Sequence, residues 1–115
     1  MEAGVELSTE KKNDVLILRV GGRLDAISSP QLEKQVMESI NEGNHNKVLM
    51  NFEQVDYLSS AGMRLLLSTT KKMKSKEGKF VICTISDSVM EVIKMAGFDH
   101  ILNIKSSEDE GLAEF

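Results

Sequence analysis

The sequence is poor in the residues that build disulfides, metal sites and aromatic clusters. Its 115 residues include one cysteine, two histidines, one proline, one tyrosine and no tryptophan. One cysteine excludes a disulfide within the chain, and Cys83 lies in the apolar stretch KFVICTI, where we expect a buried, unreactive thiol. His45 and His100 have no partners at ligand spacing, so the sequence predicts no metal site.

The chain also lacks long apolar runs and an excess of positive charge. No stretch approaches the roughly 18 apolar residues that span a bilayer, and the first residues, MEAGVELSTEKKND, are too polar and acidic for a secretory signal. The formal net charge of −4 argues against a protein that binds nucleic acid by neutralising phosphates. We therefore expect a cytoplasmic protein that binds neither membranes nor nucleic acids.

Common catalytic and phosphate-binding motifs are missing as well. The segment VGGRLD, residues 20–25, lacks both G-x-G-x-x-G and the Walker lysine, and it predicts a turn that ends a strand. Around Ser59 and Ser60 the glycine only follows the serines, so the G-x-S-x-G elbow of serine hydrolases is not formed. The carboxylates show no pairing pattern for acid/base catalysis. These absences argue against an enzyme and predict no cofactor.

Strand and helix patterns alternate along the chain. Strands are predicted at 4–10, 13–20, 47–52, 79–85 and 101–104, and helices at 28–43, within 55–74 and at 86–98; residues 106–115 leave room for a short terminal helix. The first two strands are expected to form a hairpin across residues 11–14. This β-β-α-β-α-β-α-β order predicts one α/β domain over residues 1–115, with helices that cover a mixed, mostly parallel sheet.

Local signals predict how these elements begin, end and pack. Gly21 and Gly22 are expected to end the second strand. In the helix at 28–43, Ser28 or Ser29 is the predicted cap, with Pro30 in the first turn and Gly43 at the end. Buried positions are predicted at Leu32, Val36 and Ile40, and at Val89, Val92, Ile93 and Ala96 in a helix that ends at Gly97 with Phe98 as its hydrophobic contact.

The segment VDYLSSAGMRLLLSTTKKMK, residues 55–74, places two adjacent serines at the start of a helix. A projection from Ser60 gathers one mostly apolar side, which should face the sheet: Gly62, Leu65, Leu66, Thr69 and Met73. The opposite side carries Ser60, Met63, Arg64, Leu67, Lys71 and Lys74. The serines either cap the helix or provide a hydroxyl where charge is added beside a partner-binding face.

Three segments resemble one protein family. KVLMNFEQVDYLSSAGMRLLL and GKFVICTISDSVMEVIKMAGFDHILNI resemble the STAS family, specifically its stand-alone bacterial anti-sigma factor antagonists, and the likeness runs through about Ile104. GRLDAISSPQLE resembles the family's loop into the first helix, with Asp25 at its acidic position. The resemblance implies a non-enzymatic protein that binds an anti-sigma factor with serine kinase activity and so frees a sigma factor. It also implies that the kinase phosphorylates one serine of the antagonist and that a PP2C-type phosphatase reverses this.

The family's D-S-S-G or D-S-T-G pattern falls on Ser59, Ser60, Ala61 and Gly62, which makes Ser60 the implied phosphorylation site. Because Ser59 stands where the family has an acidic residue, Ser59 is the alternative acceptor. The predicted partner-binding residues are Asp25, Ser59, Ser60, Met63, Arg64 and Leu67. Asp25 is a partner contact, a site residue near Ser60 or a solvated turn residue. Asn51 is expected to be structural, and Gly62 marks a close approach of helix and sheet.

Other interpretations stay open. The chain could be a STAS-type interaction module of another signalling or secretion complex that phosphorylation does not control. A small enzyme or nucleotide-binding protein has weak support in the residues. The resemblance leaves a monomer and a weak dimer both open, and it does not identify the kinase, the sigma factor or the stimulus.

Overall fold

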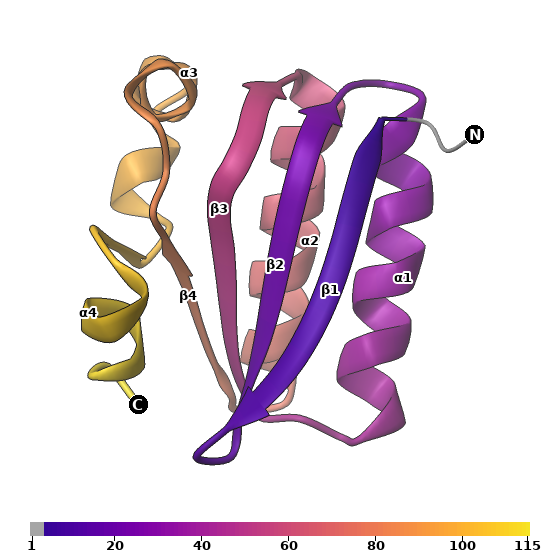
Figure 1. The fold of residues 1–115 in the computed structure, drawn as a ribbon, viewed down its shortest axis with the longest axis vertical. Coiled ribbons are helices and arrows are strands. Elements are labelled where there is room, and N and C mark those ends of the chain that lie inside the picture. The colour runs from indigo at the N-terminus through magenta and orange to yellow at the C-terminus, as the bar shows by residue number, and fades with distance from the viewer. Residues whose placement is uncertain (1–3) are drawn as a thin grey trace.

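The computed structural model describes residues 4–115, which form a five-stranded sheet with helices on both faces (Figure 1). The elements are β1 (Val5–Lys12), β2 (Val15–Leu24), α1 (Ser28–Glu42), β3 (Lys47–Leu58), α2 (Ser60–Ser75), β4 (Lys79–Cys83), α3 (Asp87–Met95), the 3-10 helix η1 (Phe98–His100), β5 (Ile104–Lys105) and α4 (Glu108–Leu112). This confirms the predicted order, including the terminal helix. Residues 1–3 of the predicted domain lie outside the described residues.

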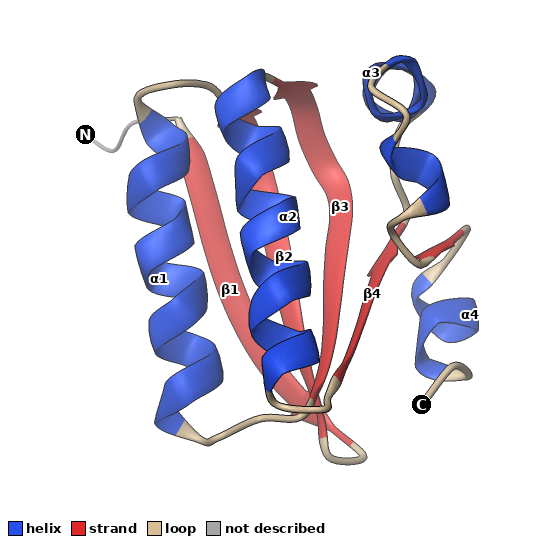
Figure 2. Ribbon diagram, turned by 180° about the vertical axis from the view of Figure 1, so that it is seen from behind, coloured by secondary structure: helices blue, strands red, loops and turns tan. Residues whose placement is uncertain are grey.

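The sheet has the strand order β1-β2-β3-β4-β5, in which β1 is antiparallel to β2 and the other neighbouring pairs are parallel. α1 and α2 lie side by side over one face (Figure 2), and α4 lies on the opposite face. The beginnings of α1, α2 and α3 all lie at the end of the sheet where β2 and β3 end. The predicted mixed, mostly parallel α/β fold is confirmed.

β2 and β3 are longer than the sequence predicts. The expected stop at Gly21 and Gly22 is wrong, because β2 continues to Leu24 and its parallel ladder with β3 continues to Leu58. Register shifts interrupt this ladder on both sides of the two glycines. Gly22 has φ +99°, and a Cβ there would lie 1.8 Å from the carbonyl oxygen of Gly4. The glycines therefore accommodate a crowded irregularity in the ladder and do not end the strand.

The predicted hairpin between β1 and β2 is confirmed. Lys12 pairs with Val15 across a two-residue turn, and both turn residues, Asn13 and Asp14, have positive φ, 54° and 69°. Two-residue hairpin turns of type I′ need positive φ at both positions, which Asn and Asp adopt more readily than other non-glycine residues. The turn sets the register of β1 on β2.

The predicted helix faces form the main core on the side of the sheet that α1 and α2 cover. Leu32, Val36 and Ile40 of α1 are fully buried. All five sheet-facing residues predicted in α2 are also buried: Gly62, Leu65, Leu66, Thr69 and Met73. A smaller cluster on the other face consists of Val15, Ile17, Leu49, Val81 and Cys83, against which Leu112 and Phe115 pack. Cys83 is buried as predicted, and its burial raises the pKa of the thiol.

The ends of α1 and α3 agree with the predictions, whereas the last strand is displaced. Pro30 lies in the first turn of α1 and Gly43 is its C-terminal cap. Gly97 adopts φ +79° after α3, and Phe98 packs against the main core. The predicted strand at 101–104 is the two-residue β5, because η1 and the turn after it take up the preceding residues.

The start of α1 differs from the prediction in its capping group. Ser28 is the first helical residue, and neither Ser28 nor Ser29 provides the cap. The Asp25 carboxylate instead accepts hydrogen bonds from the backbone N–H groups of Ser28 (2.9 Å) and Ile27 (3.0 Å). The Ser28 hydroxyl accepts from the N–H of Asp25 (3.1 Å) and donates to the carbonyl oxygen of Arg23 (2.6 Å). An aspartate before the helix thus does what was expected of a serine.

The two serines at the start of α1 should respond oppositely to loss of the hydroxyl. Ser29 is buried, and its hydroxyl has no hydrogen-bond partner within residues 4–115. A buried polar group without a partner costs roughly 1–3 kcal/mol. We predict that Ser29→Ala raises the free energy of unfolding by about 1 kcal/mol and that Ser28→Ala lowers it by about 1–2 kcal/mol, as measured by urea unfolding. A Ser29→Ala protein less stable than Ser28→Ala would contradict this.

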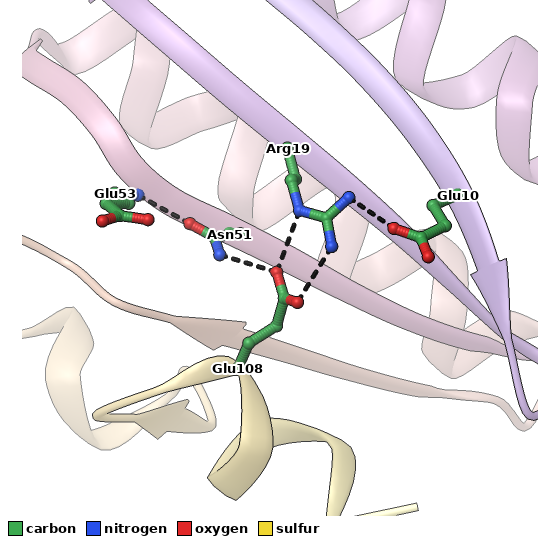
Figure 3. Close-up of polar contacts among 5 residues, drawn as sticks. All are labelled: Glu10, Arg19, Asn51, Glu53 and Glu108. Carbon is green, nitrogen blue, oxygen red and sulfur yellow. Dashed lines mark hydrogen bonds and ion pairs between the residues drawn. The ribbon is translucent and has the colours of Figure 1, made fainter.

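A polar cluster fixes α4 to the sheet (Figure 3). Glu108, the first residue of α4, accepts hydrogen bonds from Arg19 Nε (3.0 Å) and Nη2 (2.9 Å) and from Asn51 Nδ2 (2.8 Å). Arg19 Nη1 also donates to Glu10 Oε1 (2.7 Å), and Asn51 Oδ1 accepts from the backbone N–H of Glu53 (2.8 Å). The structural role predicted for Asn51 is confirmed.

This cluster should make stability depend on pH. Hydrogen bonds from Arg19, with a smaller contribution from Asn51, hold the pKa of Glu108 below its ordinary value. A carboxyl group with a lowered pKa in the folded state stabilises the fold above its unfolded pKa, and this stability is lost as the pH falls through the folded pKa. We predict that Glu108→Gln lowers the free energy of unfolding by about 1 kcal/mol near pH 7, a modest value because Arg19 and Glu108 are partly exposed.

The difference between Glu108→Gln and the wild-type chain should shrink as urea titrations move from about pH 7 to about pH 3.5. Glu38→Gln, a change at an exposed residue of α1, is the control and should have little effect at either pH. A difference at Glu108 that stays constant over this range would rule out the carboxylate as its source.

Candidate functional site

Ser59 and Ser60 lie where β3 ends and α2 begins, and they have different environments. Ser59 caps α2: its hydroxyl accepts a hydrogen bond from the Gly62 N–H (3.3 Å) and donates one to the carbonyl oxygen of Leu24 (2.7 Å). Ser60 is the first residue of α2, and it is exposed. Of the two hydroxyls, that of Ser60 is open to a modifying protein, whereas that of Ser59 is held at both its donor and its acceptor side.

We call Ser59 and Ser60, at the junction of β3 and α2, the serine loop. The end of β2 holds this loop in place. The Leu24 carbonyl oxygen accepts the N–H of Ser59 (2.9 Å) as well as its hydroxyl. Gly62 lies against the same residue, because a Cβ on Gly62 would be 2.9 Å from Leu24 Cβ and 2.6 Å from Leu58 Cδ1. This confirms the predicted close approach at Gly62, where a glycine that costs a helix about 1 kcal/mol is needed for space.

An open groove of about 420 Å³ begins at the two serines and runs between α2 and α3. Its lining comes from the start of α2 on one side and from α3 and η1 on the other: Ser59, Ser60, Met63, Arg64, Leu67, Val92, Ala96 and Phe98. Most of these side chains are apolar, and the serines and Arg64 supply the polar groups. The groove can therefore receive apolar side chains of a protein partner next to an exposed hydroxyl.

Two predictions about side-chain orientation are wrong near the groove. Met63 was expected on the outward side of α2, but it is 6% exposed and belongs to the main core. Val92 and Ala96 were expected to be buried, but they are exposed along the groove. Met63, Val92 and Ala96 all line the groove between α2 and α3, and the spacing within one helix does not indicate where such a groove lies. Arg64 is exposed and Leu67 is half-buried, which agrees with their predicted place on the outward side of α2.

Asp25 lies in the loop between β2 and α1, and its carboxylate is engaged by the backbone. The N–H of Ser28, more than that of Ile27, holds the pKa of Asp25 below its ordinary value. Asp25 is therefore a structured turn residue, and a contact between it and a partner stays a prediction. Near the end of β2, the Arg23 guanidinium stacks over the Tyr57 ring, 4.2 Å from its centroid.

Sequence reasoning missed one wall of the groove and the apolar side chains exposed beside the serine loop. Nothing in the spacing of α3 indicated that Val92 faces α2. Ile27 is 80% exposed in the loop before α1, and Tyr57 is partly exposed at the end of β3. One signal pointed to a turn at Ile27: an aspartate side chain commonly accepts a hydrogen bond from the backbone N–H two residues on, and Ile27 stands two residues after Asp25.

The other residues considered for chemistry do not form a site. His45 lies in the loop after α1 and His100 in η1. Within residues 4–115 no three histidine, cysteine or carboxylate side chains are grouped as metal ligands would be. The described helices include none that is long and apolar enough to cross a membrane.

The STAS domain family model matches residues 6–111, so the chain belongs to the STAS domain family. Among its relatives, the proposed anti-sigma factor antagonist BtrV of Bordetella bronchiseptica is 28% identical over 111 residues, which cover 96% of this chain and 95% of BtrV. The anti-sigma F factor antagonist of Paenibacillus polymyxa is 24% identical over 110 residues, which cover 96% of this chain and 94% of that protein.

Solved structures share the fold. A proposed anti-sigma factor antagonist from Thermotoga maritima superposes with a TM-score of 0.85 at 20% identity, covering 94% of this chain and 92% of its own. SpoIIAA superposes in its unphosphorylated form with a TM-score of 0.78 at 20% identity, covering 95% of both chains. The phosphorylated form of Bacillus SpoIIAA gives 0.70 at 19% identity, covering 95% of this chain and 98% of its own.

These comparisons confirm the predicted family and fold. Anti-sigma factor antagonists of the STAS family are binding proteins without enzymatic activity, so the prediction that the chain is not an enzyme is also confirmed.

Proposed function

We propose that this chain is a phosphorylation-switched antagonist of an anti-sigma factor in the bacterial cytoplasm. Unphosphorylated, it binds an anti-sigma factor that is also a serine kinase, and the sigma factor is released. Phosphorylation of Ser60 ends this binding, and a PP2C-type phosphatase restores it. The observation that carries the proposal is an exposed serine at the start of α2, at the mouth of an apolar groove.

The relatives support the binding role. BtrV and the Paenibacillus polymyxa protein are both named as anti-sigma factor antagonists, and each matches this chain over nearly its whole length. SpoIIAA has been solved in unphosphorylated and phosphorylated forms, so a domain of this fold retains its structure when phosphorylated. We extend both properties to this chain.

The position of Ser60 explains how a phosphoryl group could block binding without unfolding the domain. The start of a helix carries unpaired N–H groups and partial positive charge, which favour an anion there. Arg64 lies one turn further along α2 and is exposed, so it can approach the added charge. The phosphoryl group adds about −1.5 to −2 charges near neutral pH, and this charge stays outside the core.

The same charge is costly inside a docked complex. Two like unit charges about 4 Å apart repel by roughly 4 kcal/mol at an effective dielectric constant of about 20. Half of that energy, about 2 kcal/mol, weakens affinity roughly thirtyfold. Steric exclusion adds to this effect because the phosphoryl group occupies the mouth of the groove.

Ser60 is a better acceptor than Ser59 in this arrangement. Modification of Ser59 would remove the cap of α2 and the hydrogen bond to Leu24, and its hydroxyl would first have to leave both partners. Modification of Ser60 disrupts neither bond. Asp25, Ser59, Arg64 and Leu67 remain proposed partner contacts, with Met63 as the buried floor of the groove.

The first test is binding to the purified serine-kinase anti-sigma factor of the same bacterium, measured by titration calorimetry. Ser60→Ala should bind like the wild-type chain, because it removes only a hydroxyl. Ser60→Asp should bind at least about tenfold more weakly, because it places a permanent negative charge at the mouth of the groove. Equal affinities for the two variants would end the proposal of a charge switch.

The second test identifies the acceptor by incubation with the same kinase and ATP, followed by intact mass measurement. Ser59→Asn removes the alternative acceptor but keeps a side-chain oxygen that can cap α2, so it should gain one phosphoryl group, as the wild-type chain does. Ser60→Ala should gain none. A wild-type chain that binds the kinase but gains no phosphate would instead indicate an interaction module that phosphorylation does not control.

A further inference from the structure

Ile27 is an apolar side chain displayed to solvent by a loop. It is 80% exposed, in the connection between β2 and α1, and the residues directly after it, Ser28 and Ser29, are buried. Single exposed apolar residues occur on any surface, so exposure alone carries no conclusion. The loop that holds Ile27 and the place of this loop in the fold give it significance.

The loop is built to keep Ile27 in this position. The Asp25 carboxylate accepts the N–H of Ile27 itself (3.0 Å) and that of Ser28 (2.9 Å). The Asp25 N–H donates to the Ser28 hydroxyl (3.1 Å), and the Asp25 carbonyl oxygen accepts the N–H of Ser29 (3.0 Å). Hydrogen bonds on both sides of Ile27 therefore fix its backbone. The backbone of such a preorganised loop loses little conformational freedom when a partner covers it.

The Ile27 loop is also joined to the serine loop. Leu24, directly before Asp25, accepts both the N–H (2.9 Å) and the hydroxyl (2.7 Å) of Ser59. The beginnings of α1 and α2 lie side by side at one end of the sheet, and α3 lies on the other side of α2 (Figure 2). Ile27 and the groove therefore flank the start of α2, and a partner that covers Ser60 between them meets both.

We propose that Ile27 is an apolar anchor for the partner that docks over Ser60 and that the Asp25 turn positions it. The inference rests on the proposed function and adds a requirement to it: the anti-sigma factor presents an apolar depression that receives Ile27, apart from the side chains that enter the groove between α2 and α3. A few well-packed side chains carry most of the affinity of an interface, so truncation of Ile27 should weaken binding without any change of charge.

The experiment compares four variants by calorimetric titration with the same purified serine-kinase anti-sigma factor. Ile27→Ala should bind about tenfold or more weakly, and Ile27→Leu, which keeps the side-chain volume, should stay within about threefold of the wild-type chain. Ile101→Ala is the matched control, because Ile101 is 56% exposed but lies after η1 and outside the groove, on the connection to the strand at the far edge of the sheet. It should bind within about twofold of the wild-type chain.

Ser60→Asp in the same series separates the two proposals. Weak binding by Ser60→Asp together with unchanged binding by Ile27→Ala would overturn the anchor and leave the proposed function standing. Equal loss in Ile27→Ala and Ile101→Ala would also overturn it, because the effect would not be specific to this loop. No binding by the wild-type chain would overturn both. The thermal unfolding midpoint of Ile27→Ala should match that of the wild-type chain, because the side chain is outside the core.

Discussion

The carbonyl oxygen of Leu24 accepts two hydrogen bonds from Ser59, and the candidate site depends on this contact. It joins the ends of β2 and β3, so the loops that follow these strands are held together. Because the same serine caps α2 through the N–H of Gly62, one acceptor sets where α2 begins and how close it lies to the sheet. It also decides which of two adjacent serines keeps a free hydroxyl.

The two faces of the sheet have different roles: the candidate site lies at the end of one face, and α4 covers the other. One face carries the main core under α1 and α2, and the loops at its end provide the exposed serine, the groove and Ile27. The other face is closed by α4, which Arg19 and Asn51 hold through Glu108. Charge added at the start of α2 therefore lies on the other side of the sheet from the apolar cluster under α4. It also stays outside the main core, because Ser60 is exposed.

The sequence predicted most of the fold because each element has a strong local signal. The apolar spacing of α1 and of the sheet-facing side of α2 predicted burial correctly for the residues that face the sheet. It failed at Met63 and Val92, where α2 and α3 share a groove and burial depends on how two helices are placed. It failed again at Gly21 and Gly22, because a strand irregularity and a strand end use the same residues.

The candidate site was predictable only in part. Helix position pointed to Ser60, and the resemblance to a family supplied the chemistry that we propose for it. The capping aspartate was missed as a cap because two serines stood nearer the helix, and Ile27 was missed because exposure of a single loop side chain has no periodicity. The sequence allows a turn at Asp25, but the hydrogen bonds that make it the cap and leave Ile27 exposed are seen only in the structure.

Cys83 is the single cysteine of the chain, and it is buried. It belongs to the small apolar cluster that Leu112 of α4 and Phe115 cover. A thiol reagent cannot reach it while that cluster is closed. The rate at which such a reagent labels the native protein therefore measures how often α4 and the residues after it move away from the sheet. The natural cysteine serves as the probe, so no label has to be introduced by mutation. Labelling rates taken with and without a bound partner would report whether events at the start of α2 are felt on the opposite face of the sheet.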